Sequence, residues 1–141
     1  NASGRTVALD AVTGQPNWTA KDGATGPVWV DGRAVFLVSD QNELVRLKAS
    51  DGERVWGIQL PGVVPTRNKL RSRDVYAHYG PVLAGRHLWV ASNDGHLRGF
   101  DPVDGRMTND LAVAGGATTR PIIVDGTMYI VTQQGQLVAF R

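Results

Sequence analysis

The sequence predicts an all-β protein made of short antiparallel strands. Glycine is dense, with 17 among 141 residues, and its even spread interrupts any long helical pattern. Short runs rich in valine, leucine, isoleucine and aromatic residues recur, each bounded by Gly, Asp, Asn or Ser. Each run has the length of one strand, about 5–6 residues, and is too short for a typical helix. Three such runs are 34–38, 87–90 and 128–131.

Composition excludes several classes of function. The 15 Lys and Arg residues against 13 Asp and Glu give a net charge of +2, which is too small a basic surplus for nucleic-acid binding. The absence of cysteine excludes disulfide scaffolds, thiolate metal sites and cysteine nucleophiles. No apolar run approaches the roughly 20 residues of a membrane helix. Any signal or membrane anchor is therefore expected outside this sequence.

An internal repeat determines the predicted architecture. The turn Asp10-Ala11-Val12-Thr13-Gly14, followed by Trp18, returns as Lys48-Ala49-Ser50-Asp51-Gly52, followed by Trp56. A third copy is Asp101-Pro102-Val103-Asp104-Gly105. The copies are about 40 and about 50 residues apart, and a period near 40 with four short strands is typical of a β-propeller blade.

Turn residues separate the four strands, A to D, of each repeat. Strand A follows a proline, as after Pro27, Pro81 and Pro121, and strand B follows a glycine turn. Asp-Gly supplies the positive φ that a two-residue hairpin requires. Strand C precedes the second glycine turn, and strand D carries the tryptophan. We expect that ring to cover the seam between neighbouring blades.

Along the chain, the repeat predicts about three and a quarter blades in a single propeller fragment. Residues 1–22 form the second half of a blade, 23–60 a full blade, 61–115 a full blade with a basic insertion at 61–79, and 116–141 a last blade of three strands. Such a fragment cannot close into a ring and leaves open sheet edges. We expect the remainder of a longer propeller, or alternatively a second chain, to close it.

The motif Ala8-Leu9-Asp10-x-x-Thr13-Gly14-x-x-x-Trp18 resembles the repeat of the PQQ-like propellers, although Asn109 replaces the tryptophan in the third copy. A narrower resemblance is to the C-terminal half of the BamB family, lipoproteins of the outer-membrane β-barrel assembly machinery. It is carried by 30–42, by 80–83 after the insertion, and by the terminus 135–141.

This resemblance implies an eight-bladed ring without enzymatic activity, bound quinone or other cofactor. It also implies a periplasmic location in a Gram-negative bacterium, with attachment to the outer membrane through a lipid on an N-terminal Cys outside this sequence. The implied partners are the POTRA domains of the BamA-type subunit, and no nucleic acid.

Two segments are candidates for partner binding. The insertion carries four closely spaced basic residues that could dock an acidic partner or lipid headgroups: Arg67, Lys69, Arg71 and Arg73. The alternative is a solvated connection between blades. In the resembled family, partner contacts come from loops at one end of the central blades, which adds Asp10 and Val12.

No catalytic, cofactor-binding or metal-binding residue is predicted. The acidic turn residues recur in every repeat, which favours capping of turn N–H groups over catalysis. The spacing of His78, His87 and His96 matches no common zinc motif. We expect His87 and His96 to be cross-strand neighbours, and His78 to lie beside the propeller channel.

Three functions remain open from the sequence. The first is a non-enzymatic periplasmic scaffold that binds POTRA domains and assists outer-membrane protein folding and insertion, with β-augmentation as one mode of contact. The second is a fragment of a PQQ-dependent quinoprotein dehydrogenase, which would need a quinone, a calcium site and a catalytic carboxylate. The third is a generic ligand-binding propeller, which rests on fold analogy alone.

Overall fold

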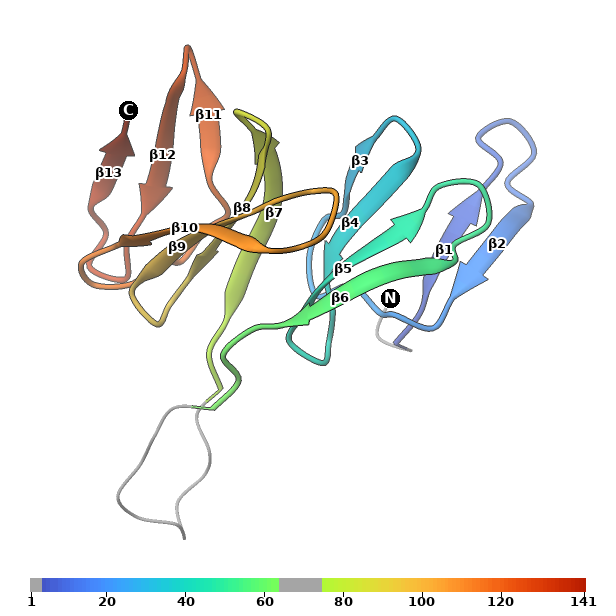
Figure 1. Ribbon diagram of the computed structural model, residues 1–141, viewed down its shortest axis with the longest axis horizontal. Helices are drawn as coiled ribbons and strands as arrows, with labels where there is room; N and C mark the ends of the chain where they lie inside the picture. Colours follow the sequence, from blue (N-terminus) through green and yellow to red (C-terminus); the bar gives the residue numbers. More distant parts are fainter. Residues whose placement is uncertain (1–3, 64–74) are drawn as a thin grey trace, which may run out of the picture.

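The computed structural model describes residues 4–63 and 75–141 (Figure 1). These residues form β-strands and turns with no helix, so none of them provides a helix that could cross a membrane. The all-β prediction is confirmed. The strands are β1 (Thr6–Leu9), β2 (Pro16–Ala20), β3 (Trp29–Asp31), β4 (Ala34–Val38), β5 (Glu43–Lys48), β6 (Arg54–Gln59), β7 (His78–Ala84), β8 (His87–Ser92), β9 (His96–Phe100), β10 (Met107–Ala112), β11 (Ile122–Val124), β12 (Thr127–Val131) and β13 (Leu137–Phe140).

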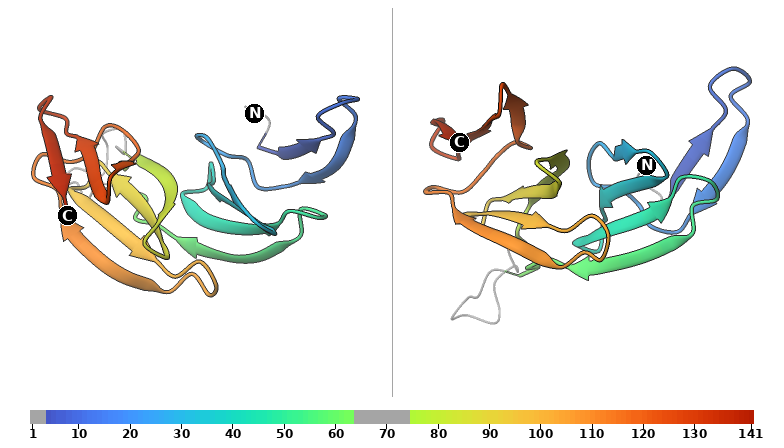
Figure 2. Two further views of the ribbon diagram at one scale, coloured as in Figure 1. Left: turned by 90° about the horizontal axis from the view of Figure 1, so that it is seen from above. Right: turned by 45° about the horizontal axis from the view of Figure 1, so that its top comes forward.

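The strands form four antiparallel sheets in sequence order: β1–β2, β3–β6, β7–β10 and β11–β13. Within each sheet every strand pairs with the next one along the chain. The sheets follow one another across Figure 1 and form an open arc, with β6 and β10 along its convex side (Figure 2). This arrangement confirms a partial propeller of antiparallel blades. The division of the chain at residues 22, 60 and 115 stays a prediction.

Burial on both faces explains the continuous apolar runs of the central strands. All five residues of β4 are buried. Phe36 and Val38 pack with Leu88 and Val90 of the next sheet, whereas Leu37 packs with Ala20 of the preceding sheet. Successive side chains of a strand point to opposite faces, so a blade between two neighbours needs apolar residues at consecutive positions.

Three hydrophobic cores, one at each sheet–sheet interface, result from this packing. The core between β1–β2 and β3–β6 contains Ala20, Val35, Leu37, Val45 and Leu47. The core between β3–β6 and β7–β10 contains Ala34, Phe36, Val38, Leu44, Leu60, Leu88, Val90 and Phe100. The core between β7–β10 and β11–β13 contains Ala91, Leu97, Val113, Ala117, Met128 and Ile130.

The repeat tryptophans cover the seams between sheets, as predicted. The indole of Trp18 donates a hydrogen bond of 2.8 Å to the carbonyl oxygen of Ala49 in the next sheet's turn. Trp56 donates in the same way to Val103, at 2.9 Å. The Trp56 ring lies against Gly105, and the Trp18 ring lies against Gly52. At each of these two seams an indole hydrogen bond and a ring-on-backbone contact therefore join one sheet to the next.

Candidate partner-binding surface

The β1–β2 turn presents the two candidate residues at its tip. The Asp10 carboxylate accepts hydrogen bonds from the backbone N–H groups of Val12 and Thr13, at 3.0 and 2.7 Å, and from the Thr13 hydroxyl at 2.9 Å. The Gly14 N–H donates to the Asp10 carbonyl oxygen, which closes the turn. These hydrogen bonds, those from Thr13 first, hold the pKa of Asp10 below its ordinary value of 3.8.

The equivalent carboxylates confirm that the acidic turn residues cap N–H groups. Asp101 accepts from the N–H of Val103 at 2.7 Å, and Asp104 accepts from that of Arg106 at 2.9 Å. Asp51 accepts from the N–H of Glu53 at 2.9 Å. Asp10 therefore shapes the turn at the candidate surface through the hydrogen bonds that its Oδ1 accepts.

Val12 is the exposed apolar residue of this surface. Its side chain is 93% exposed, while Val103 at the matching position of the β9–β10 turn is 71% exposed. The carbonyl oxygen of Val103 is engaged by Trp56 and by Arg46 of the preceding sheet. The side chain of Val103 stays solvent-accessible even so. A residue at this turn position can thus keep an exposed side chain even when the backbone of the turn contacts a neighbouring blade.

The basic cluster of Arg67, Lys69, Arg71 and Arg73 lies outside the described residues. The stem that carries the insertion is described. Val63 and Val75 form an antiparallel bridge, and the Tyr76 N–H donates to the Gly62 carbonyl oxygen at 3.0 Å. The stem is thus closed at its base by backbone pairing, next to the first residue of β7.

The expectation that His87 and His96 are cross-strand neighbours is wrong. β8 and β9 run antiparallel, with Leu88 opposite Phe100 and Ala91 opposite Leu97. Two residues that each begin a strand of an antiparallel hairpin lie at its opposite ends. His96 instead contacts Asp110 of β10, with 2.7 Å between Nδ1 and Oδ1.

A buried ion pair at the β8–β9 turn was missed by the sequence reasoning. Arg98 and Asp94 are joined at 2.7 Å, and their side chains are 11% and 6% exposed. Burial raises the pKa of Asp94, but the hydrogen bond and charge of Arg98 outweigh it, so the pKa lies below 3.8. The only sequence signal of this pair is an acidic residue before a turn glycine, followed by a basic residue in the next strand.

The described residues contain no group of three His, Cys, Asp or Glu side chains that could hold a metal ion. Several acidic side chains in that part of the chain serve as turn caps or as partners of basic residues, such as Asp22 and Glu43 on Arg54. This surface therefore presents exposed apolar residues at turn tips, and sheet edges, to a partner.

Comparison with known proteins identifies a family and several curated proteins that are similar to this chain. Residues 1–58 match the family described as outer membrane protein assembly factor BamB. BamB of Escherichia coli (strain K12) is 28% identical over 134 residues, which cover 94% of this chain and 31% of that protein. BamB of Salmonella typhimurium (strain LT2) is 28% identical over 138 residues, covering 97% and 32%. The chain thus spans about a third of the length of these relatives.

Solved structures show the same fold. The crystal structure of BamB from Moraxella catarrhalis superposes with a TM-score of 0.73 at 22% identity, covering 98% of this chain and 44% of that one. The computationally designed Ika4 protein gives 0.68 at 13% identity, covering 99% and 80%. The chain folds as part of a β-propeller and is similar along nearly its whole length to outer membrane protein assembly factor BamB.

Proposed function

We propose that this chain is part of a non-enzymatic scaffold of the outer-membrane β-barrel assembly machinery. It acts on the periplasmic side of the outer membrane and binds the POTRA domains of a BamA-type subunit. The observation that carries the proposal is the similarity of 94–98% of the chain to proteins named outer membrane protein assembly factor BamB.

The chemistry of the chain supports a binding role. Repeat carboxylates accept hydrogen bonds within their own turns through Oδ1, as at Asp10 and Asp101. The candidate contact groups for a partner are the exposed Val12 and the basic residues of the insertion, Arg67, Lys69, Arg71 and Arg73. Apolar contacts of a few exposed residues with a charged rim are typical of protein–protein interfaces.

The test is binding of the intact protein to the purified POTRA segment of its BamA-type subunit, with and without added quinone and calcium. We expect binding that does not depend on quinone or calcium. Uptake of quinone without POTRA binding would assign the protein to the quinoprotein dehydrogenases instead.

Variants locate the binding face. Val12→Ser should weaken POTRA binding, whereas the matched control Val103→Ser, at the same position of another turn, should not. Arg67→Gln and Arg71→Gln test the insertion in the same assay. Equal effects of Val12→Ser and Val103→Ser would remove the β1–β2 turn from the interface.

A further inference from the structure

An apolar cavity lies at the seam between the β7–β10 and β11–β13 sheets. It has a volume of about 300 Å³, which is at the lower end of the range of pockets that bind small groups. Six large apolar side chains line it: Trp89, Leu97, Leu111, Ile123, Met128 and Phe140. The cavity can be reached from solvent, because Leu111 is 36% exposed and Trp89 and Phe140 are half-buried.

Strand pairing identifies the same positions at the preceding seam. Across β8, β9 and β10, one row of opposite residues consists of Trp89, Gly99 and Asn109. The matching row across β4, β5 and β6 consists of Phe36, Arg46 and Trp56. With these rows aligned, the six cavity residues have as counterparts, in the same order, Phe36, Leu44, Ile58, Leu83, Leu88 and Phe100.

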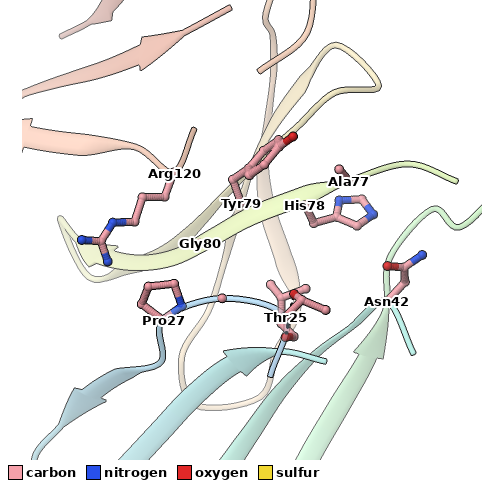
Figure 3. A pocket seen from close by; sticks show the side chains of 10 residues that line it. Thr25, Pro27, Asn42, Ala77, His78, Tyr79, Gly80 and Arg120 are labelled. Carbon is pink, nitrogen blue, oxygen red and sulfur yellow. Dashed lines mark hydrogen bonds between the residues drawn. The ribbon is translucent and has the colours of Figure 1, made fainter. Parts of the chain in front are cut away.

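At the preceding seam an indole fills the corresponding space. All six counterparts pack, together with Trp56, in the core between the β3–β6 and β7–β10 sheets. The centroids of the Trp56 and Phe36 rings are 6.1 Å apart. The cavity of that seam lies elsewhere, and none of the six counterparts lines it. Figure 3 shows that cavity along β7, with Thr25, His78 and Tyr79 among its lining residues.

Two differences between the repeats leave the space open at the later seam. Asn109 and Gly99 stand at the positions that Trp56 and Arg46 occupy one sheet earlier. The Trp89 ring uses part of the room, since its Cζ3 lies 3.1 Å from the Cβ position of Gly99. The Asn109 side chain is short, and its Oδ1 accepts a hydrogen bond of 2.9 Å from the hydroxyl of Thr108 on the same strand. The place of the second ring therefore stays unfilled.

We propose that this cavity binds an aromatic side chain, best a tryptophan, that a protein partner presents. The ring takes the place that Trp56 takes one seam earlier. The aromatic walls of Trp89 and Phe140 and the thioether of Met128 all favour an aromatic occupant. Arg141 also lines the cavity, and a guanidinium stacks favourably on an aromatic face. This inference rests on the proposed partner-binding function and names one recognition element within it.

Methyl NMR of the intact protein tests the cavity without the POTRA domains. N-acetyl-tryptophanamide is added to protein labelled at its methionine and isoleucine methyl groups, and N-acetyl-leucinamide is the aliphatic control. We expect the Met128 and Ile123 signals to shift, because both side chains line the cavity and an aromatic ring carries a ring current. Aromatic contacts add about two- to tenfold in affinity beyond the buried area, so the tryptophan compound should bind more tightly by that factor. Equal binding of the two compounds would overturn the proposal.

Variants at Asn109 locate the site. Asn109→Trp supplies the missing ring from the chain itself and should abolish the shifts. Asn109→Phe fills the space with a smaller ring and keeps the test decisive if the larger ring prevents folding. The matched control Asn109→Gln keeps an amide and should bind as the unsubstituted protein does. Unchanged binding in both filled variants would show that the ring binds elsewhere and would overturn the proposal.

The POTRA segment tests the source of the ring. Asn109→Trp should weaken POTRA binding about tenfold or more, as loss of an aromatic anchor does, and Asn109→Gln should not. Unchanged POTRA binding in Asn109→Trp, with the methyl shifts present in the unsubstituted protein, would overturn a partner side chain as the occupant. POTRA binding without methyl shifts would reject the cavity and leave the scaffold role standing. Methyl shifts without any POTRA binding would reject the scaffold role and leave the aromatic cavity standing.

Discussion

The contact between a tryptophan ring and a turn glycine is the smallest unit of this architecture. Gly52 has a φ of +74°, and a Cβ built there would lie 2.4 Å from Cε3 of Trp18. Backbone conformation and close approach of the ring thus both require glycine at this position. Gly14 has nearly the same φ, +71°, but nothing within 4 Å of its Cβ position, so there only the backbone conformation favours glycine.

These two glycines allow the conformational and steric contributions to be separated. Gly14→Ala should lower the free energy of unfolding by about 1–2 kcal/mol, the cost of a left-handed residue with a side chain. Gly52→Ala should cost about 1–3 kcal/mol more, because the methyl group displaces the Trp18 ring. Urea denaturation followed by tryptophan fluorescence measures both. Equal costs would show that the ring moves without loss of packing.

His78 should make stability depend on pH in the neutral range. Burial lowers its pKa below 6.5, against the opposing influences of the Pro61 carbonyl and Asp94, while Arg98 lowers it further. The unfolded chain therefore binds the proton at a higher pH than the folded chain does. The free energy of unfolding should fall as the pH drops below 6.5, by at most about 1.4 kcal/mol per pH unit, and level off below the folded-state pKa.

A comparison of variants isolates this contribution. His78→Gln should flatten the pH dependence of the urea midpoint between about pH 5 and 7 relative to the unsubstituted protein. The lowered pKa values of Asp10 and Asp51 act near and below 3.8 and leave this range unaffected. An unchanged slope in His78→Gln would contradict the prediction.

Sequence patterns predict the residues that act through local geometry. Asp10 and Asp101 were expected as turn caps from their place in the repeat, and their hydrogen bonds confirm it. His78, Arg120 and Asn42 line one cavity because separate blades pack together. No spacing in the chain predicts which residues of different blades will line the same cavity. The sequence therefore predicts His78 beside the channel but does not single out Arg120.

At the scale of elements, apolar runs and turn residues were sufficient to predict the strands. The run Ala34–Val38 is strand β4, and Trp18 and Trp56 lie on the outer strands β2 and β6. The antiparallel pairing of β8 with β9 was predicted, but not its register. The expected contact of His87 with His96 was wrong for a simpler reason: each begins its strand, and antiparallel pairing places the two strand starts at opposite ends of the hairpin.

The β8–β9 turn should depend on its buried ion pair. Arg98→Gln leaves the Asp94 carboxylate, 6% exposed, without its charged partner, and removal of one member of a buried pair costs about 3–5 kcal/mol. Lys48→Gln is the matched control, since its pair with Glu53 is 49% and 65% exposed and an exposed ion pair contributes little to stability. Chemical denaturation of both variants measures the difference. Similar losses would show that water reaches Asp94 once Arg98 is replaced.

At the scale of the whole molecule, each of the three cores among the described residues lies between two sheets that are consecutive in the series. Ile130 belongs to the core between β7–β10 and β11–β13, whereas Leu37 belongs to the core between β1–β2 and β3–β6. Stability in such an array is approximately a sum of the stability of each unit and of its interfaces with its neighbours. A defect in one core should therefore loosen the two sheets that share it and leave distant sheets protected.

Amide hydrogen exchange on two buried-residue variants tests this linear coupling. Ile130→Ala and Leu37→Ala each remove a fully buried branched side chain, at a cost of about 2–5 kcal/mol. Ile130→Ala should accelerate exchange in β11–β13 first and leave β4 and β5 protected, because those strands contribute nothing to its core. Leu37→Ala should do the reverse, with β12 unaffected. Uniform acceleration along the whole chain in both variants would instead mean that the blades unfold as one cooperative unit. The hydrogen bonds from Trp18 to Ala49 and from Trp56 to Val103 would then help to transmit a defect across the two seams that they bridge.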